Sequence, residues 1–325
     1  MSKAIRIHKT GGPEMMRWEE VAIGDPGPGQ IRLRHQAVGL NFIDVYHRTG
    51  LYPLPALPSG LGLEGAGVVD AVGEGVSDFK IGDRVAYASP PPGSYAEMRL
   101  MPADRVVALP DAIDERTAAA MMLKGLTAQY LLRRTYKVQP GDAILVHAAA
   151  GGVGLIACQW ANRLGAIVIG TVGSEAKAEL AHAHGCHHTI LYNKENFVER
   201  VREITDGKGV AVVYDSVGKD VFMDSLDCLR PLGMMVTFGN ASGPVPSIEP
   251  LLLSNKGSLF LTRPTLMAYM AKREDLLASA ADLFAVVGSG SVKIEINQTY
   301  PLSDVAQAHR DLEARKTTGS TVLLV

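Results

Sequence analysis

An apolar segment at residues 143–148 leads into small residues and glycines, and then into an apolar, helix-like segment. Ala149, Gly151 and Gly154 have the spacing of a phosphate-binding turn, with alanine in place of the usual first glycine. A strand, a tight turn and a helix N-terminus in this order direct backbone N–H groups and the positive end of the helix dipole at a pyrophosphate. Taken alone, the pattern also fits any glycine-rich turn between a strand and a helix.

The segments that follow favour the dinucleotide-binding interpretation. From Gly141 onward, short apolar segments alternate with helix-like ones. The expected strands are 143–148, 166–172, 189–191, 210–215, 234–238 and 258–262, and the expected helices run from the turn to near Gly165 and over 175–184, 195–205 and 220–229. Six strands alternating with helices predict a doubly wound parallel sheet of the Rossmann type. The turn is therefore predicted to hold a dinucleotide through Ala149, Gly151, Gly152, Val153 and Gly154.

The two ends of the chain differ from this middle part. The first third has short β-like segments at 5–7, 30–35, 65–72 and 84–87, followed by a helical segment at 111–132. A helix is expected over 273–287, and the tail to residue 325 is again β-like. We therefore expect residues 1–125 and 266–325 to form one domain, with residues 126–265 inserted into it as the cofactor-binding domain.

Composition excludes several classes of protein. The 325 residues suffice for two domains, and the net charge of −2 argues against nucleic acid as a partner. Cys158, Cys186 and Cys228 lie far apart, which fits a reducing compartment better than a disulfide framework. The N-terminal segment is not typical of a signal peptide, and no apolar run is long enough to span a membrane. We expect a cytoplasmic protein.

Several motifs together carry a resemblance to a known family. The chain has GLEGAG at 62–67, GDRV at 82–85, GSYAE at 93–97 and HAAAGGVG at 147–154. With these it resembles the medium-chain dehydrogenase/reductase superfamily. Further segments make it similar to the zeta-crystallin-like NADPH:quinone oxidoreductases: GLNFIDVY at 39–46, LKGLTA at 123–128, YDSVG at 214–218 and FGN at 238–240. The resemblance implies a GroES-like, β-rich substrate domain around the Rossmann domain, an active site in the cleft between them, and a homodimer.

The sequence departs from the zinc-dependent members of that superfamily. Those relatives have a cysteine near position 41 and a histidine before the glutamate at position 64, where this chain has Asn41 and Leu63. The run of four closely spaced cysteines that binds a structural zinc is also missing. Zinc sites in proteins need three or four Cys, His or carboxylate ligands. We expect no metal and a zinc-free reaction.

The segment that follows the second strand of the predicted sheet indicates which dinucleotide is used. NAD-binding versions of the fold carry an acidic residue about 20 positions beyond the turn. Counting from Gly151 leads to residues 170–174, which contain no carboxylate, and Gly173 and Ser174 stand there instead. Lys177 and Tyr192 follow, and Arg315 is a contact of the type the resemblance implies; together they favour the 2′-phosphate of NADPH. Glu175 lies nearby, so use of NADH stays an alternative.

Candidate catalytic residues follow from the chemistry of the acceptor. A quinone that accepts a hydride becomes an oxyanion, which a neutral hydrogen-bond donor stabilises. Asn41, Tyr46 and Tyr52 are such donors and match the cleft positions of the family, and Tyr46 is the first choice. For both tyrosines, the alternative to a catalytic role is a role in packing. Asn41, Tyr46 and Asn240 are candidates for substrate binding.

The remaining candidate cofactor contacts lie in two places. Lys124 and Thr127 belong to the helix that leads into the cofactor domain. The others lie in or directly after the last strands of the predicted sheet, whose carboxyl ends border the binding crevice: Ser216, Phe238, Gly239, Asn240, Phe260 and Arg263. The sequence thus predicts an NADPH-dependent quinone reductase. Two alternatives stay open: an enone or enoyl reductase of the same superfamily, and a non-enzymatic NADPH- or RNA-binding protein.

Overall fold

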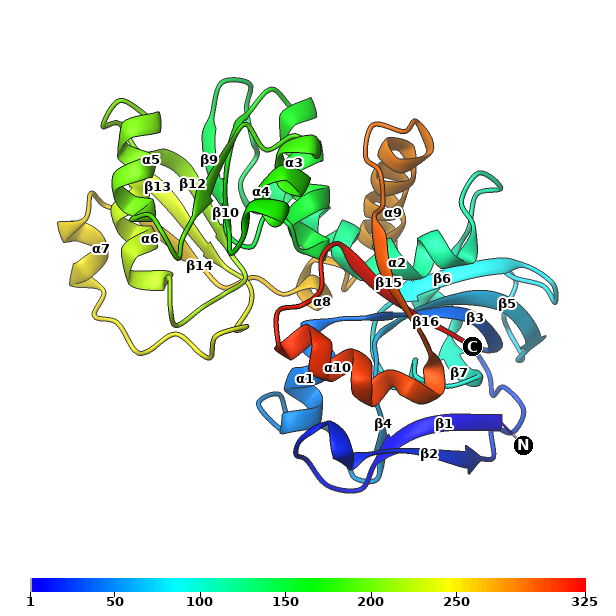
Figure 1. Ribbon diagram of the computed structural model, residues 1–325. Coiled ribbons are helices and arrows are strands. Elements are labelled where there is room, and N and C mark those ends of the chain that lie inside the picture. Colours follow the sequence, from blue (N-terminus) through cyan, green and yellow to red (C-terminus); the bar gives the residue numbers. More distant parts are fainter. Residues whose placement is uncertain (1) are drawn as a thin grey trace. The chain divides into compact units, whose positions relative to one another are not determined.

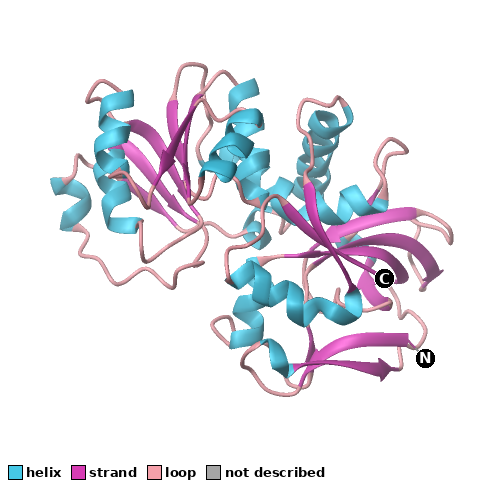
Figure 2. Cartoon of the chain, viewed as in Figure 1, coloured by secondary structure: helices cyan, strands magenta, loops and turns pink. Residues whose placement is uncertain are grey.

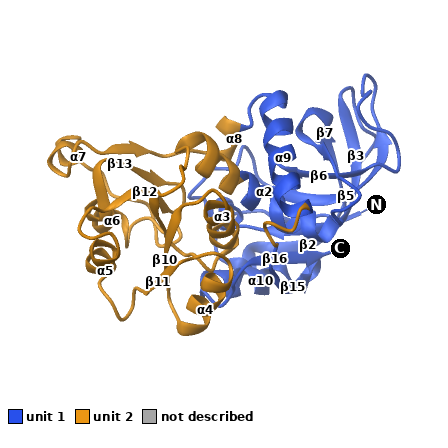
Figure 3. Ribbon diagram, turned by 90° about the horizontal axis from the view of Figure 1, so that it is seen from above, with its two compact units in different colours: residues 1–126, 270–288, 294–325 blue, residues 127–269, 289–293 orange. Residues whose placement is uncertain are grey.

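The computed structural model describes residues 2–325, which form two compact units (Figure 3). Unit 1 comprises the residues up to 126 together with 270–288 and 294–325, and unit 2 comprises residues 127–269 and 289–293. The first division falls within the helix α2 (Glu115–Tyr130). No helix within residues 2–325 is long and apolar enough to cross a membrane.

Unit 2 is built on a six-stranded sheet in which every strand pair is parallel. The strands are β9 (Ala143–Val146), β10 (Ile167–Val172), β11 (His188–Leu191), β12 (Val210–Asp215), β13 (Leu229–Thr237) and β14 (Phe260–Thr262). Their order is β11-β10-β9-β12-β13-β14. The chain thus starts in the middle, winds outward to β11, and then returns to wind outward in the other direction. This is the doubly wound order of dinucleotide-binding sheets, so the fold predicted for the middle of the chain is confirmed.

Helices cover both faces of this sheet. Figure 1 shows α3 and α4 on one side of it and α5 and α6 on the other. The helices of unit 2 are α3 (Gly152–Arg163), α4 (Glu175–Ala183), α5 (Phe197–Ile204), α6 (Phe222–Cys228), α7 (Leu251–Asn255) and α8 (Leu266–Tyr269), and a π-helical turn η3 (Leu131–Thr135) follows α2. Because both faces are covered, all six residues of β12 are buried. Ile169, Val213 and Met235 form part of the core beneath α5 and α6.

Unit 1 is rich in β-structure (Figure 2). A three-stranded sheet has the order β2-β1-β4, and a seven-stranded sheet has the order β15-β16-β3-β5-β6-β8, with β7 also pairing with β3. The strands are β1 (Ser2–Ile7), β2 (Met16–Val21), β3 (Gln30–Leu40), β4 (Ser59–Gly60), β5 (Glu64–Val72), β6 (Arg84–Ala88), β7 (Met98–Pro102), β8 (Val107–Ala108), β15 (Ile296–Pro301) and β16 (Ser320–Leu324). The C-terminal strand β16 lies beside β3, so residues from the first third and from the tail of the chain share one sheet.

Besides α2, the described residues of unit 1 form three α-helices and three 3₁₀ turns. These are α1 (Phe42–Thr49), α9 (Arg273–Gly288), α10 (Val305–Glu313), η1 (Pro13–Met15), η2 (Ala103–Arg105) and η4 (Leu302–Asp304). The helix α10 packs on a cluster that includes Leu40, Tyr95 and Leu302. A second cluster, with Leu33, Val69 and Phe79, fills the space under the large sheet.

The sequence-based prediction was wrong in several details. The first third was predicted as β-like, but it contains α1, and the tail contains α10. The short helix α1 is bounded by Asn41 as its N-cap and by Gly50 as its C-cap. Gly50 lies in the left-handed region at φ 84°. The strand predicted to reach residue 148 ends at Val146, because Ala148 has φ 55° and already belongs to the turn.

Candidate functional site

The loop between β9 and α3 forms the predicted phosphate turn. Its backbone is tied to the neighbouring strands, since the amide of His147 donates to Tyr214 O at 3.0 Å and that of Ala149 donates to Thr171 O at 3.1 Å. Gly151 is the N-cap of α3, and it makes no side-chain cap hydrogen bond to the first turn of that helix. The first N–H groups of a twelve-residue helix are thus left for an external anion.

The small residues of the turn are required by close packing. A Cβ placed on Gly154 would overlap the carbonyl oxygen of Ala148 and lie 2.6 Å from that of Ala149. Gly154 therefore allows α3 to start directly against the end of β9. Ala149, at the position of the usual first glycine, is fully buried. Its methyl group faces Gly170 of β10, whose added Cβ would lie 2.5 Å from it. The missing glycine of the motif is thus matched by a glycine on the neighbouring strand.

The carboxyl end of β10 has hydroxyl and ammonium groups but no carboxylate directly after the strand. Ser174 is the N-cap of α4, and its Oγ accepts the amide of Lys177 at 3.4 Å. Tyr192, at the end of β11, lies over Gly173, since a Cβ there would be 2.6 Å from the phenol oxygen. Glu175 forms an exposed ion pair with Lys194 at 2.8 Å. The structure thus brings Gly173, Ser174, Lys177 and Tyr192 to one end of the sheet.

The candidates on the second half of the sheet also lie at its carboxyl end. Ser216 follows β12, and Phe238, Gly239 and Asn240 follow β13. Arg263 follows β14 and donates to Thr237 O at 3.2 Å. Phe260 differs from the others, because it opens the edge strand β14 and is 56% exposed.

A buried aspartate, which the sequence analysis did not single out, organises this end of the sheet. Asp215 is the last residue of β12, and its Oδ1 accepts the amides of Val217 and Gly218 at 2.7 and 2.9 Å. Burial raises the pKa of its carboxyl group, and those two amides oppose the shift. Asp215 therefore fixes the loop that carries Ser216.

In unit 1, the predicted catalytic residues lie on and beside α1. Tyr46 is a buried residue of α1. The Tyr52 ring packs edge-on against the Tyr46 ring, with their centroids 5.1 Å apart. The Tyr52 amide also donates to Tyr46 O at 3.1 Å, so the loop after the helix folds back on it. The rings of Tyr46 and Tyr52 are thus brought together beside α1.

Asn41 and Lys124 converge on a buried carboxylate that the sequence analysis did not single out as a site residue. Glu64 is fully buried at the start of β5. Its Oε2 accepts Asn41 Nδ2 at 2.7 Å and Lys124 Nζ at 3.2 Å, and its Oε1 accepts the Leu123 amide at 2.7 Å. The amide nitrogen of Asn41 and the ammonium group of Lys124 are thus each bound to a partner within unit 1. No local sequence motif predicts this contact, because Glu64 and Lys124 are 60 residues apart.

The last two candidates lie in different units. Thr127 is a buried residue of α2 within unit 2. Arg315 belongs to unit 1, where it follows α10 with φ 58° and is exposed.

Comparison with known proteins gives a consistent result. Residues 27–111 match the model of the alcohol dehydrogenase GroES-like domain, and residues 152–285 match that of the zinc-binding dehydrogenase domain. The chain is 56% identical to a quinone oxidoreductase of Pseudomonas aeruginosa over 324 residues, which covers 100% of both proteins. It belongs to the quinone oxidoreductase family of the medium-chain dehydrogenase/reductases. The predicted GroES-like domain is thereby confirmed as well, with the match at residues 27–111.

Two further relatives bear on function. The structure of Escherichia coli quinone oxidoreductase complexed with NADPH has a TM-score of 0.98 at 50% identity and covers 99% of this chain and 100% of its own. A 2-haloacrylate reductase from a Burkholderia species is 50% identical over 333 residues, covering 100% of this chain and 99% of the relative.

The chain lacks the ligand set that the name of the matched dehydrogenase domain suggests. Within residues 2–325, no three or more His, Cys, Asp or Glu side chains are grouped so that they can hold a metal ion. At the two positions where zinc-dependent relatives carry ligands, Asn41 is bound to Glu64 and Leu63 is a buried apolar residue. The donor set of this region is therefore an amide, a carboxylate and an ammonium group, and zinc requires more anionic or imidazole ligands than these provide.

Proposed function

We propose that this protein reduces quinones with NADPH and without zinc. The observation that carries the proposal is the 56% identity, over the full length of both proteins, to a quinone oxidoreductase. The phosphate turn supports it independently, because the turn has the close-packed glycines and free helix N-terminus that a dinucleotide requires.

Unit 2 has the residues needed to hold NADPH. The turn at Ala149, Gly151, Gly152, Val153 and Gly154 offers backbone N–H groups to the pyrophosphate. Ser174, Lys177 and Tyr192 offer two hydroxyls and a positive charge to a 2′-phosphate. The ion pair of Glu175 with Lys194 supports this assignment, since it partly neutralises the carboxylate that follows Ser174 in the sequence. Arg315 of unit 1 is proposed as a further contact of the 2′-phosphate.

The nicotinamide half is assigned to the second half of the same sheet edge. Ser216, Phe238, Gly239, Asn240 and Arg263 all stand at carboxyl ends of β12 to β14. Thr127, Lys124 and Phe260 complete the proposed set of contacts.

The chemistry of the acceptor assigns the role of Tyr46. NADPH supplies a hydride when it is bound. Negative charge then develops on an acceptor oxygen, and we propose that the Tyr46 hydroxyl donates a hydrogen bond to that oxygen. Tyr52 packs against the Tyr46 ring and restricts its direction. Asn41 and Asn240 are proposed to line the acceptor site, with the Asn41 amide oriented by Glu64.

One relative favours a second candidate function. The 50% identity to a 2-haloacrylate reductase supports reduction of an activated carbon–carbon double bond by the same fold. That reaction needs a proton at carbon, so a tyrosine of α1 or the loop after it is then assigned as the acid rather than as a hydrogen-bond donor.

The quaternary state and the compartment are also proposals. The family resemblance supports a homodimer, and the edge strand β14 exposes the apolar residues Phe260 and Leu261. The cysteines Cys158, Cys186 and Cys228 are unpaired and buried, which supports a reducing, cytoplasmic environment. Light scattering of the purified protein gives the mass in solution and tests the dimer.

The test of the main proposal follows the oxidation of NADPH and NADH by chelator-treated protein. Simple quinones and 2-haloacrylate serve as parallel acceptors. Turnover of quinones with NADPH and little with NADH is the expected result. Turnover of 2-haloacrylate alone supports the second candidate function, reduction of a carbon–carbon double bond. Loss of activity on chelation contradicts the zinc-free mechanism.

A further inference from the structure

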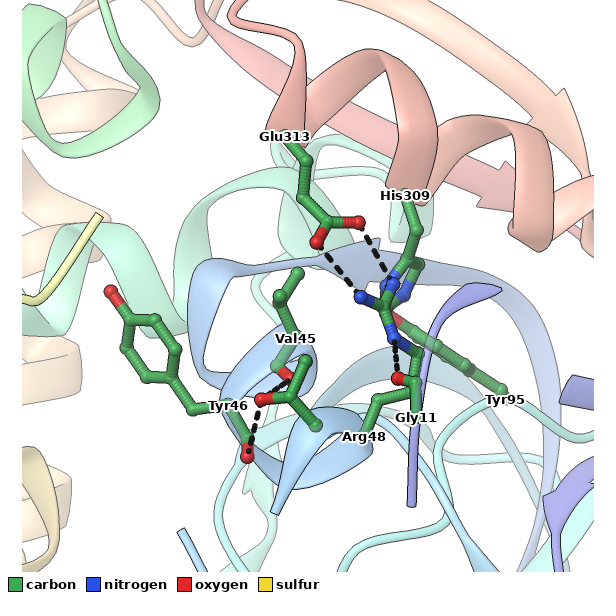
Figure 4. A network of polar contacts seen from close by, with 8 residues as sticks. Gly11, Val45, Tyr46, Arg48, Tyr95, His309 and Glu313 are labelled. Atoms are coloured by element: carbon green, nitrogen blue, oxygen red, sulfur yellow. Dashed lines mark hydrogen bonds and ion pairs between the residues drawn. The ribbon is translucent and has the colours of Figure 1, made fainter. Parts of the chain in front are cut away.

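A chain of buried polar contacts crosses unit 1 and ends at Asp44 on α1. Figure 4 shows Glu313, Arg48, His309 and Tyr95 of this chain. It begins at Glu313 of α10, whose carboxylate accepts two hydrogen bonds from Arg48 at 2.8 and 2.9 Å. Arg48 Nη1 lies 3.0 Å from His309 Nδ1, and His309 Nε2 lies 3.2 Å from the Tyr95 hydroxyl. That hydroxyl donates to Asp44 Oδ2 at 2.7 Å. Every residue in this chain except Glu313 is almost fully buried.

The chemistry of the groups fixes the direction of each hydrogen bond. A guanidinium group only donates, so His309 Nδ1 accepts from Arg48. A neutral imidazole then carries its proton on Nε2 and donates it to Tyr95. Burial and the charge of Arg48 lower the pKa of His309 to about 3, which keeps the ring neutral. The single proton of the Tyr95 hydroxyl is left for Asp44, so the whole chain is polarised toward that carboxylate.

Asp44 in turn holds the N-terminus of α1. Its Oδ2 accepts a hydrogen bond from the backbone N–H of Asn41 at 2.9 Å. Asp44 occupies the third position of the helix, where a carboxylate also interacts favourably with the helix dipole. Its Oδ1 is buried without a hydrogen-bond partner among residues 2–325. Because α1 has only eight residues, its stability depends on such terminal contacts.

The anchored face of α1 is not the face that carries Tyr46. Asp44 and Arg48 are four residues apart and share one side of the helix. Tyr46 lies between them in sequence and leaves the helix on a different side, as Figure 4 shows. The contacts of Asp44 and Arg48 thus set the rotation of α1 about its axis, and with it the direction of the Tyr46 ring.

We propose that Asp44 is a positioning residue for Tyr46, with its carboxylate oriented by the hydrogen-bonded chain from Arg48 through His309 and Tyr95. The role of Tyr46 rests on the proposed function, whereas the anchoring of α1 does not. The charge of Asp44 matters because an ionised carboxylate accepts both of its hydrogen bonds more strongly than a neutral one.

Titration of Asp44 provides a specific signature. Burial raises the pKa of its carboxyl group to about 7, and the hydrogen bonds from Tyr95 and Asn41 oppose the shift. The other charged groups near it are Lys124 of α2, which favours the anion, and Glu64 of β5, which disfavours it. On the far side of Tyr95, His309 does not change its charge near neutral pH. The anchoring of Tyr46 is therefore expected to weaken as the pH falls below about 7.

The first experiment needs no turnover. The protein is labelled with ¹³C in its tyrosine rings, and the Tyr46 resonance is assigned by its loss in Tyr46→Phe. The Tyr46 resonance is expected to move with a midpoint near pH 7, and this titration is expected to vanish in Asp44→Asn. In Tyr95→Phe, which removes a donor to the anion, the midpoint is expected to shift to higher pH. Asp83→Asn is the matched control, because Asp83 also accepts a backbone amide at 2.9 Å in a turn of unit 1.

The second experiment connects the anchoring to catalysis. With 1,4-benzoquinone as acceptor, Asp44→Asn is expected to lower kcat about 10-fold to 100-fold above neutral pH, because the donor is misplaced. The Kd for NADPH is expected to stay within about two-fold, since the cofactor residues lie mainly in unit 2. Unfolding curves show whether each variant is folded. If Asp44→Asn does not fold, the kcat and the Tyr46 resonance of Tyr95→Phe test the positioning role instead.

The outcomes separate the two proposals. A Tyr46 resonance that is indifferent to Asp44→Asn and to Tyr95→Phe overturns the positioning role, whatever the activity. A resonance that titrates as expected in a protein without quinone turnover keeps the positioning role and overturns the proposed function instead.

Discussion

The methyl group of Ala149 in the phosphate turn faces Gly170 of β10, and a Cβ added at Gly170 would lie 2.5 Å from it. The same added carbon would lie 2.7 Å from Cys186 Sγ. A side chain at residue 149 is therefore accommodated by the absence of one at residue 170. The alanine in place of the usual glycine is therefore compensated by a glycine on the adjacent strand, since Gly170 of β10 pairs with Val146 at the end of β9, directly before the turn.

Gly170→Ala is expected to destabilise the protein by about 1–3 kcal/mol, because it overpacks a closed space. The affinity for NADPH is expected to fall as well, since Ala149 must shift. The double variant Gly170→Ala with Ala149→Gly is expected to recover part of the loss, and urea unfolding of all four proteins in the cycle measures the coupling. Gly288→Ala, where the added carbon has open space, is the control. Strict additivity of the two changes contradicts this compensation.

Lys177→Ala and Arg315→Ala are expected to weaken NADPH binding far more than NADH binding. Each charge-assisted hydrogen bond to a 2′-phosphate contributes about 1.5–3 kcal/mol, so roughly a 10-fold to 100-fold increase in the Kd for NADPH is expected. Fluorescence titration with both cofactors measures the difference. Lys208→Ala, at an exposed lysine before the amino end of β12, serves as the control. Equal losses for the two cofactors would remove these residues from the 2′-phosphate site.

Sequence patterns predicted the sheet of unit 2 well because its strands are buried on both faces. Apolar runs such as residues 210–215 were recognised to the residue. The start of β13 was missed by five positions, since Arg230, Pro231 and Gly233 interrupt the apolar pattern that marks a strand. The ends of helices were found only approximately, because caps rather than periodicity determine them.

The interactions within the candidate site were much less accessible to sequence analysis. Residue types and motifs pointed to Tyr46 and Asn41, but not to Glu64 as the buried partner of Asn41. Contacts such as Tyr95 with His309 join residues 214 positions apart, and no local pattern encodes them. The Asn41 and Asp44 spacing of a capping box, together with Gly50 at the other end, was the available signal for α1.

Tyr46→Phe is expected to lower turnover of quinones roughly 10-fold to 100-fold, because the proposed donor to the developing oxyanion is lost. Binding of NADPH is expected to change little. Steady-state kinetics with a direct measurement of cofactor affinity separate the two effects. Tyr52→Phe keeps the ring contact of 5.1 Å between the two tyrosines and is the matched comparison. Unchanged turnover in Tyr46→Phe would leave that residue a packing role only.

The stability of the protein is expected to fall as the pH decreases from about 6.5 toward 3, in part because of His147. This buried imidazole contacts Thr171 Oγ1 at 2.9 Å and Ser225 Oγ at 2.8 Å, and burial lowers its pKa to about 3. The unfolded chain binds a proton at His147 below about pH 6.5 while the folded chain does not, so acid favours unfolding. Each such group contributes up to about 1.4 kcal/mol per pH unit to the slope. Urea unfolding at several pH values is expected to show a shallower slope in His147→Gln than in the parent, with His8→Gln, at an exposed histidine, as the control. A slope unaltered by His147→Gln means that the imidazole is protonated in the folded state as readily as in the unfolded one.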